Sequence, residues 1–206
     1  MKRNLGRPRE FDPNDFLDIA LDCFWTRGYQ ATSISDLMKA SGLASASIYK
    51  LYPDKRSIFF AALSQYMEQG LGRLRTRAQK KSPEAALRET LEYGALLSTG
   101  AEGERGCFTI AAASELLPGD DEVKVKVRNK FNGIKENLLN ILLLGQQMKI
   151  FRTDIEAAVM AETIFMMLEG MRVYGKVSPD YQSLVKANEF IIGSVMATHT
   201  AEDREL

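Results

Sequence analysis

The residues of this chain that are best suited to chemistry lie in the stretch GLASASIYKLYPDKRSIF, Gly42 to Phe59. Small side chains are followed there by two tyrosines and two lysines, Tyr49, Lys50, Tyr52 and Lys55, around a proline. Hydroxyl and ammonium groups donate hydrogen bonds to phosphates and to base edges. The stretch holds no set of metal ligands, no nucleophile with a base and no phosphate-binding glycine loop. These residue types therefore indicate binding rather than catalysis.

Two short helices are expected to position these side chains. Ser33–Asp36 has the pattern of a capping box, so the first helix begins there, and Gly42 marks its end. The second helix covers about residues 44–50, and Pro53 stands just before the next one. A short helix, a Ser-Gly turn and a second short helix form the plan of a helix-turn-helix, whose second helix enters the major groove of DNA. The alternative is a three-helix packing unit with surface tyrosines.

In a helix-turn-helix, the second helix needs small side chains where it approaches the bases. Four residues meet this requirement: Ala44, Ser45, Ala46 and Ser47. Tyr49 and Lys50 are placed to reach phosphates or base edges. Lys55 adds a charge at a helix N-terminus, which already favours a phosphate. Thr32 and Ser33 stand in the same way at the start of the preceding helix.

The order of residues from Phe11 to Phe59 resembles the DNA-binding domain of the TetR family of transcriptional regulators. The matching residues are Ala20, Phe24, Gly28-Tyr29, Ala31-Thr32-Ser33-Ile34, Asp36-Leu37, Ser41-Gly42-Leu43, Ser47-Ile48-Tyr49, Tyr52-Pro53 and Lys55. The resemblance implies base contacts from Ser45, Ala46, Ser47 and Lys50. It implies phosphate contacts from Thr32, Ser33, Tyr49 and Lys55. Tyr52 completes the set of DNA-binding candidates.

Two residues depart from the family pattern, and a basic leader precedes it. Ala44 stands where the family commonly has a serine that caps the recognition helix, so we expect a weaker cap. Leu51 stands where the family commonly has Tyr or His, so a phosphate contact is expected to be missing. Arg3, Arg7 and Arg9 lie in a leader whose Gly-Arg-Pro segment favours an extended arm, and arginines bind the narrow minor groove of A·T-rich DNA. A solvated terminus that becomes ordered only on DNA is compatible with this prediction.

The composition is that of an ordinary soluble globular protein, with 45% hydrophobic and 26% charged residues and a net charge of zero. Residues 1–56 carry nine basic and seven acidic side chains, which allows a local positive face. The two cysteines, Cys23 and Cys107, cannot form a disulfide framework. The N-terminus lacks the apolar segment of a signal peptide, and no stretch reaches the length that spans a bilayer. A cytoplasmic protein without a membrane partner is expected.

Helical periodicity continues along the chain, so the predicted fold class is all-α with about nine helices. An N-terminal three-helix DNA-binding domain with the arm and the helix-turn-helix covers residues 1–56. A C-terminal effector-binding and dimerisation domain covers residues 57–206, and a helix over 54–80 links the two. Val123–Arg128 alternates like a strand, but the apolar residues beyond it continue at helical spacing, which favours a helix. Residues 99–106, which contain three glycines, are expected to form a loop.

The family resemblance implies that the last two helices pair across a two-fold axis in a homodimer. The predicted interface consists of Met160, Ile164, Met167, Leu168, Met171, Phe190, Ile191, Val195 and Met196. Apolar surfaces of this size are unfavourable on a monomer. The alternative is that these side chains face the core of their own subunit.

The resemblance also implies an effector pocket inside the C-terminal helical bundle. The candidates are Tyr93, Leu97, Cys107, Phe108, Ile110, Met148, Phe151, Phe165, Met166 and Tyr174. Five of the nine methionines lie between Met148 and Met171. Because methionine adapts to irregular apolar ligands, a largely apolar small-molecule effector is expected. Aromatic residues and methionines at helical spacing also serve as core, which is the alternative.

The combined prediction is a ligand-responsive repressor that binds a palindromic operator in double-stranded DNA as a dimer and is released by a small molecule. In a first alternative, Cys107, which follows Arg105-Gly106 at a helix start, acts as a redox or electrophile sensor. In a second, the protein binds DNA without an effector. An enzyme is not expected, because the single histidine, His199, lies near the polar C-terminus and no zinc, phosphate or dinucleotide motif is present. No cofactor or metal is predicted.

Overall fold

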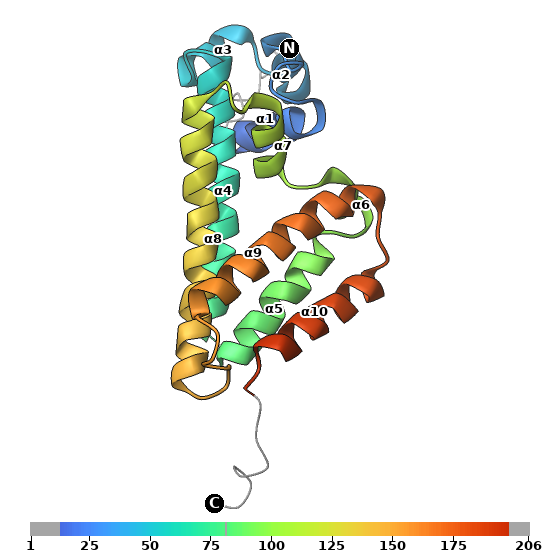
Figure 1. Cartoon of the computed structure of the whole chain (residues 1–206). Helices are drawn as coiled ribbons and strands as arrows, with labels where there is room; N and C mark the ends of the chain where they lie inside the picture. The colour runs from blue at the N-terminus through green and yellow to red at the C-terminus, as the bar shows by residue number, and fades with distance from the viewer. Residues whose placement is uncertain (1–12, 81, 198–206) are drawn as a thin grey trace, which may run out of the picture. The chain divides into compact units, whose positions relative to one another are not determined.

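A computed structural model of the chain describes residues 13–80 and 82–197. These residues form ten α-helices and one short 3-10 helix, and Figure 1 shows them coloured along the chain. The α-helices are α1 (Pro13–Arg27), α2 (Ile34–Ser41), α3 (Ser45–Leu51), α4 (Lys55–Lys80), α5 (Pro83–Leu96), α6 (Gly100–Arg105), α7 (Phe108–Leu116), α8 (Asp121–Gln147), α9 (Ala157–Tyr174) and α10 (Tyr181–Val195). The 3-10 helix, η1, is Gly175–Val177. The predicted all-α fold is confirmed.

The chain divides into two compact units within α4, between Tyr66 and Met67. Unit 1 contains α1, α2, α3 and the first part of α4, and unit 2 contains the rest of α4 and all later helices. The expected boundary, after residue 56, lies ten residues earlier on the same helix. α4 is therefore a continuous helix that contributes residues to both units.

The core of unit 1 is largely aromatic. Phe16, Phe24 and Phe59 have almost no exposed surface. The rings of Phe24 and Phe59 meet edge to face, with centroids 5.4 Å apart. Leu37 of α2 and Ile48 of α3 are fully buried. Because helices of seven or eight residues are not stable alone, this burial holds α2 and α3 in place.

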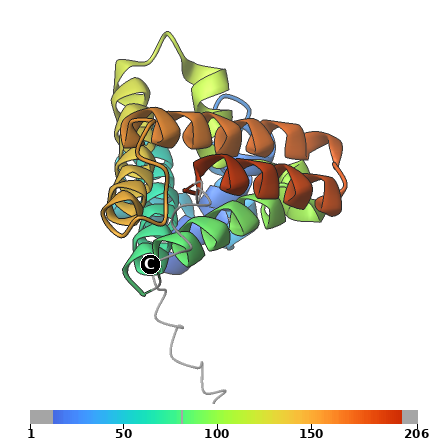
Figure 2. The same cartoon turned by 60° about the horizontal axis from the view of Figure 1, so that its bottom comes forward.

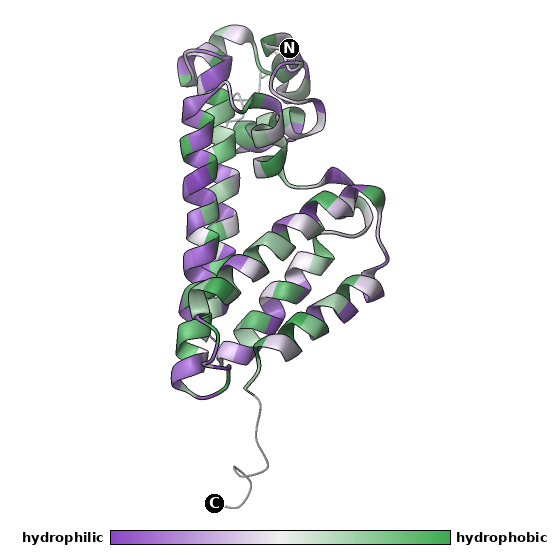
Figure 3. Cartoon of the chain, in the orientation of Figure 1, coloured by the Kyte–Doolittle hydropathy of each residue, from purple (hydrophilic) through white to green (hydrophobic). Residues whose placement is uncertain are grey.

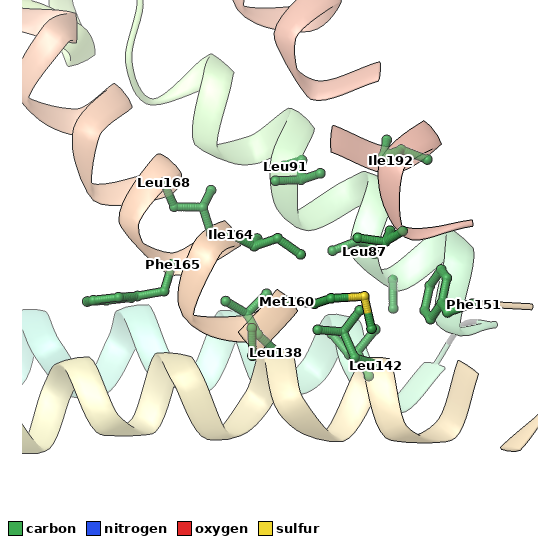
Figure 4. Packing of buried hydrophobic residues seen from close by; sticks show 14 of the residues in the cluster. Leu87, Leu91, Leu138, Leu142, Phe151, Met160, Ile164, Phe165, Leu168 and Ile192 are labelled. Atoms are coloured by element: carbon green, nitrogen blue, oxygen red, sulfur yellow. The ribbon is translucent and has the colours of Figure 1, made fainter. Parts of the chain in front are cut away.

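The core of unit 2 lies among α5, α8, α9 and α10. Figure 2 shows α5, α9 and α10 side by side, and α8 packs along α9. Figure 4 shows buried side chains from these helices and from the segment after α8 gathered together: Leu87, Leu91, Leu138, Leu142, Phe151, Met160, Ile164 and Ile192. In Figure 3, α8 is hydrophilic along much of the side in view, whereas α5 and α9 show apolar and hydrophilic residues mixed along their length. The apolar stripes of these helices thus share one core.

Two segments test the assignment of helices from the sequence. Val123–Arg128 lies within α8, so the prediction of a helix there is confirmed. Residues 99–106 contain the six-residue helix α6, which corrects the prediction of a loop. A glycine is required inside this helix, because a β-carbon on Gly103 would lie 2.5 Å from the carbonyl carbon of Ser98. Gly106 then ends α6 with a φ of +78°, in the left-handed region.

No three or more His, Cys, Asp or Glu residues among those described gather as metal ligands would. Crossing a membrane would take a longer or more apolar helix than any in residues 13–80 and 82–197.

Candidate functional site

A capping box fixes the start of α2. The Ser33 hydroxyl accepts a hydrogen bond from the Asp36 N–H at 3.1 Å, and the Asp36 carboxylate accepts one from the Ser33 N–H at 2.9 Å. Asp36 also forms an ion pair with Arg27 of α1, with an N–O distance of 2.8 Å. The hydrogen bonds from Ser33, assisted by Arg27, lower the pKa of Asp36 to about 2. The capping box predicted from the sequence is confirmed.

A glycine makes the turn between α2 and α3. Gly42 has a φ of +71°, in the left-handed region that residues with a β-carbon rarely adopt. Its N–H donates to the Met38 carbonyl at 2.8 Å and closes the end of α2. The chain then enters α3 at Ala44, which makes no side-chain capping hydrogen bond. The weaker cap expected at this position is confirmed.

The surface of α3 combines small side chains with longer hydrogen-bond donors. Ile48 is 0% exposed and anchors the helix in unit 1. Ala46, Ser47, Tyr49 and Lys50 are exposed. Methyl and hydroxyl groups allow a helix to approach base edges closely, while a phenol and an ammonium group reach further, to bases or phosphates. This surface can therefore read DNA in the way expected of a recognition helix.

Thr32 and Tyr52 both make contacts within unit 1. Thr32 is 1% exposed, and its hydroxyl donates to the Gly28 carbonyl at 2.7 Å. It therefore satisfies a carbonyl just beyond α1, and its assignment to a phosphate is corrected. The Tyr52 ring packs 6.0 Å from the Phe16 ring, centroid to centroid, and burial raises the pKa of its hydroxyl. Tyr52 is partly exposed, so it contributes to the packing of unit 1 and stays a candidate for DNA binding.

Lys55 is held by the segment that follows α1. Its ammonium donates to the Tyr29 carbonyl at 2.9 Å and lies 4.4 Å from the centroid of the Tyr29 ring. An ammonium has three donors, so Lys55 keeps capacity for a phosphate and stays a candidate. Ser33 is exposed and Ser45 is partly exposed, and both stay candidates as well. Three further candidates lie outside the described residues: Arg3, Arg7 and Arg9.

The candidates for an effector pocket in unit 2 divide into three groups. Three are buried: Phe108, Phe151 and Phe165. Four are partly buried: Tyr93, Leu97, Cys107 and Ile110. Three are more than half exposed: Met148, Met166 and Tyr174. The exposed three do not line an interior pocket, because their side chains lie at the surface, and this corrects their assignment.

Most of the predicted interface residues face the core of their own subunit. Five are buried in unit 2: Met160, Ile164, Leu168, Met171 and Val195. Three are partly buried: Met167, Ile191 and Met196. Phe190 is 76% exposed. The five buried side chains are at most 8% exposed and leave little surface for a partner subunit, which corrects their assignment to an interface.

A different apolar face of α9 is exposed, and its residues are not among those predicted for the interface. Val159, Met166 and Val173 are each more than half exposed. They are seven residues apart, which is close to two helical turns, so they lie along one face. This spacing was a signal in the sequence. It was hidden because α9 is also apolar on its buried face.

Two charged side chains of unit 2 are buried and a third, that of Glu169, is partly buried, and none of the three was predicted from the sequence. Lys130 of α8 is 9% exposed and Arg172 of α9 is 8% exposed, while Glu169 of α9 has a buried carboxylate oxygen. Burial raises the pKa of Glu169 to about 7 and lowers the pKa of Lys130 to about 8. A signal was present, because Lys130 follows Val123 and Val127 at helical spacing, in the apolar stripe of α8.

Two cavities of unit 2 lie at helix junctions. One of about 380 Å³ lies between α4, α5 and α8, with Arg75, Gln79 and Asn140 in its lining. Another, of about 230 Å³, lies between α5 and α10, with Arg88 and Asn188 in its lining. Neither cavity is lined by any of the predicted effector-pocket residues. The sequence-based choice of pocket residues therefore did not find these two cavities.

Comparison with known proteins agrees with this geometry. Residues 16–62 match the family described as "Bacterial regulatory proteins, tetR family", and residues 83–191 match "Tetracyclin repressor-like, C-terminal domain". The two matches fall on the helix-turn-helix and on the helices of unit 2. Fold and recognition surface together define a helix-turn-helix transcriptional regulator. The chain belongs to the TetR family, as the resemblance of its N-terminal third predicted.

Individual relatives cover nearly the whole chain. ComR of Escherichia coli (strain K12), an HTH-type transcriptional repressor, is 25% identical over 188 residues, which are 90% of each chain. KstR2 of Rhodococcus jostii (strain RHA1), also an HTH-type transcriptional repressor, is 27% identical over 178 residues, 81% of this chain and 82% of the relative. A cysteine-substituted form of the regulator CifR, solved with 26-base-pair operator DNA, is similar in fold with a TM-score of 0.79. That similarity covers 91% of this chain and 99% of the other, at 24% identity.

Proposed function

We propose that this protein is a cytoplasmic, non-enzymatic transcriptional repressor that binds a palindromic operator as a homodimer and releases it when a small molecule binds unit 2. The observation that carries the proposal is the exposed surface of α3. Ser47 and Lys50 are its base contacts, and Ala46 lets the helix approach the groove. Tyr49 and Ser33 bind phosphates on either side. The relation to ComR, a repressor, over 90% of both chains supports this function.

The homodimer would form through the exposed faces of α9 and α10. Val159, Met166 and Val173 supply apolar contacts from α9, and Phe190 supplies one from α10. A β-carbon on Gly170 of α9 would have no atom within 4 Å, so this part of the helix is open to close approach. Large apolar side chains exposed on two helices that contact each other are typical of a protein–protein contact surface. A two-fold dimer accounts for a palindromic operator, because each recognition helix reads one half-site.

Release would follow from a shift between two populations of the dimer. DNA accepts two recognition helices only when they are about 34 Å apart, one helical turn of the duplex. α4 contributes residues to both units, so a ligand that moves α4 in unit 2 also moves its first turns in unit 1. The ligand must bind the released conformation more tightly than the DNA-bound one, since otherwise it shifts nothing.

The proposal is tested by selecting DNA sequences with the purified full chain. A palindromic sequence should be enriched. Lys50→Ala should weaken binding to it by roughly 5- to 150-fold and relax the choice of base, as expected for loss of one base contact. Lys124→Ala, which removes an exposed lysine of α8, is the control and should leave affinity and selectivity unchanged.

Three results would contradict parts of the proposal. No enrichment at low salt would exclude a sequence-specific regulator. Equal affinity for all sequences would favour the effector-independent DNA-binding protein instead. An enriched site without two-fold symmetry would contradict the dimer.

A thiol switch at Cys107 is a second candidate, favoured by the position of this residue. Cys107 is the N-cap residue of α7 and lies within electrostatic range of the Lys130 ammonium. Alkylation with N-ethylmaleimide should then weaken operator binding in Cys23→Ser, which keeps Cys107, and leave Cys107→Ser unaffected. Unchanged operator affinity after complete alkylation of Cys107 would remove this candidate.

A further inference from the structure

Two buried cations and a carboxylate meet around the junction of α6 and α7 in unit 2. Arg172 of α9 donates a hydrogen bond to the carbonyl oxygen of Gly106. Lys130 of α8 is within electrostatic range of Cys107, the next residue, and of Glu169 on α9. Glu169 is in turn within range of Lys130 and Arg172. Two helices thus bring two positive charges and one negative charge to the same region.

The hydrogen-bonding and ion-pairing capacity of these three side chains is not fully used. The Nη1 atom of Arg172 and the Oε2 atom of Glu169 are buried and have no hydrogen-bond partner in the described part of the chain. The Lys130 ammonium donates to the Met67 carbonyl of α4 at 3.0 Å and has two further donors. Among the described residues, no ion pair within 4.0 Å joins Glu169 to either cation.

Buried charged side chains with unpaired polar atoms and no ion-pair partner are rare in native proteins. A buried ion loses its hydration, and it is normally paired or bound to a ligand. With Glu169 ionised, the set has a net charge of +1, so one added negative charge neutralises it and an added cation is repelled. The shifted pKa values of Glu169 and Lys130 both have burial as their first cause. Guanidinium and ammonium groups with unused donors are the groups that bind a carboxylate most strongly.

We propose that the small molecule bound by unit 2 carries a single carboxylate, held by Lys130 and Arg172, on an otherwise apolar body. This inference rests on the proposed effector response. The apolar body follows from the neighbouring side chains. Phe165 lies one helical turn before Glu169 on α9, and its ring packs edge to face against that of Phe131 of α8, with centroids 5.2 Å apart. A neutral ligand would leave the net positive charge in place, and a dianion would reverse it.

Lys130 also gives a bound carboxylate a route to α4. The ammonium lies against Gly70 of α4, where a β-carbon would be 2.7 Å from the Nζ atom. Its hydrogen bond to Met67 is likewise to α4. A carboxylate that draws the ammonium away from these residues changes the contact between α8 and α4. The first turns of α4 belong to unit 1 and directly follow α3 in the chain, so a change in the contacts of α4 affects a helix that both units share.

The first test measures ligand binding to the full chain without DNA. Two matched probe sets are titrated by calorimetry and thermal unfolding at low ionic strength: hexanoate, 1-hexanol and hexylamine, and benzoate, benzyl alcohol and benzylamine. At least one carboxylate should bind roughly tenfold or more tightly than the alcohol with the same body, and the amines should not bind. Alcohols that match their carboxylates, or no carboxylate binding in either set, would overturn the proposal.

Variants then place the site. Lys130→Met removes the ammonium, keeps an unbranched side chain and should abolish the preference for carboxylate over alcohol. Glu169→Gln raises the net charge of the set to +2 and should tighten carboxylate binding several-fold. Lys124→Met removes an exposed lysine of the same helix and should change neither. An affinity for the carboxylate that is unchanged in both Lys130→Met and Glu169→Gln would contradict the site. Lys130→Met should weaken carboxylate binding and Glu169→Gln should tighten it. Either variant therefore tests the site even where the other folds poorly.

Operator release is measured separately, so the two proposals can fail independently. Carboxylates that bind through Lys130 but leave the operator complex intact would support the anion site and contradict the proposed effector response. Neutral molecules that release the operator, with no preference for carboxylates, would support the effector response and contradict the anion site. Carboxylates that bind through Lys130 and release the operator support both.

Discussion

At the scale of single residues, hydrogen bonds between neighbours in the chain affect how firmly the two helices of the helix-turn-helix begin. Ser33 and Asp36 satisfy two N–H groups at the start of α2. Ala44 leaves the start of α3 without a side-chain cap. The helix that reads DNA is therefore held mainly by the buried side chain of Ile48. An uncapped recognition helix depends on its neighbours in unit 1, and α2 is the part of that support which acid can weaken.

Acid should remove the contribution of Asp36 to the stability of unit 1. Its pKa is lowered in the folded state from the ordinary 3.8 to about 2. The ionised carboxylate therefore stabilises the fold above pH 3.8, and this stabilisation is lost as the pH falls through about 2. Between these values, the wild type should lose more free energy of unfolding than Asp36→Asn. Urea titrations followed by the fluorescence of the single tryptophan, Trp25, measure this free energy of unfolding in unit 1.

Asp15→Asn is the control for this experiment. Asp15 is an exposed aspartate in the first turn of α1. This variant should follow the wild type through the same pH range. A wild-type curve that runs parallel to that of Asp36→Asn would show that the capping box does not stabilise unit 1.

At the scale of elements, glycines decide where the helices of unit 2 can approach other parts of the chain. Gly145, in the last turns of α8, is the tightest contact, because a β-carbon there would lie 2.0 Å from the Phe151 ring. Phe151 is fully buried, and its neighbour Ile150 accepts a backbone hydrogen bond from Ala197 at 2.9 Å. The Phe151 ring thus packs the segment after α8 against Gly145, and the backbone hydrogen bond joins that segment to the one after α10.

Gly145→Ala should displace Phe151 and destabilise unit 2 by about 1–3 kcal/mol, as expected for an overpacked core. Gly72→Ala is the matched control, because Gly72 lies in α4 and a β-carbon there meets no atom within 4 Å. It should stabilise the chain by up to about 1 kcal/mol, since alanine is the better helix former. Guanidinium unfolding followed by circular dichroism measures both. Equal effects of the two substitutions would mean that a β-carbon at position 145 does not overpack the Phe151 ring.

At the scale of the whole molecule, the exposed apolar side chains of α9 and α10 bear on its assembly. Phe190 is 76% exposed, and it lies on the last helix of the described chain. A single exposed aromatic side chain would need no explanation. Together with Val159, Met166 and Val173 it forms the set that we propose as the subunit interface.

Phe190→Glu should weaken the homodimer by at least roughly thirtyfold, because a charge replaces a large aromatic contact. Sedimentation equilibrium measures the dissociation constant, and operator binding should fall with the dimer fraction. Val125→Glu makes a comparable change at an exposed position of α8 and should leave the dimer intact. A Phe190→Glu protein that stays dimeric would place the interface elsewhere.

Much of the recognition site could be predicted because its determinants are local. The capping box spans four residues, the turn depends on the φ of Gly42, and the missing cap at Ala44 depends on one side chain. Helical periodicity likewise needs only neighbours three and four positions away, so the all-α fold could be derived from spacing. Family resemblance then added the expected role of each residue on α3.

The sequence by itself thus determined all the α-helices except α6, the turn between α2 and α3 and the residue types offered to DNA. Only the tertiary structure decided which side chains are free to act. Lys55 binds a carbonyl 26 residues away, Lys130 one 63 residues away and Arg172 one 66 residues away. On α9, which is apolar on both faces, helix packing decided which face is buried and which is exposed. Burial depends on contacts between distant segments, and no local pattern specifies which of two equally apolar faces they cover.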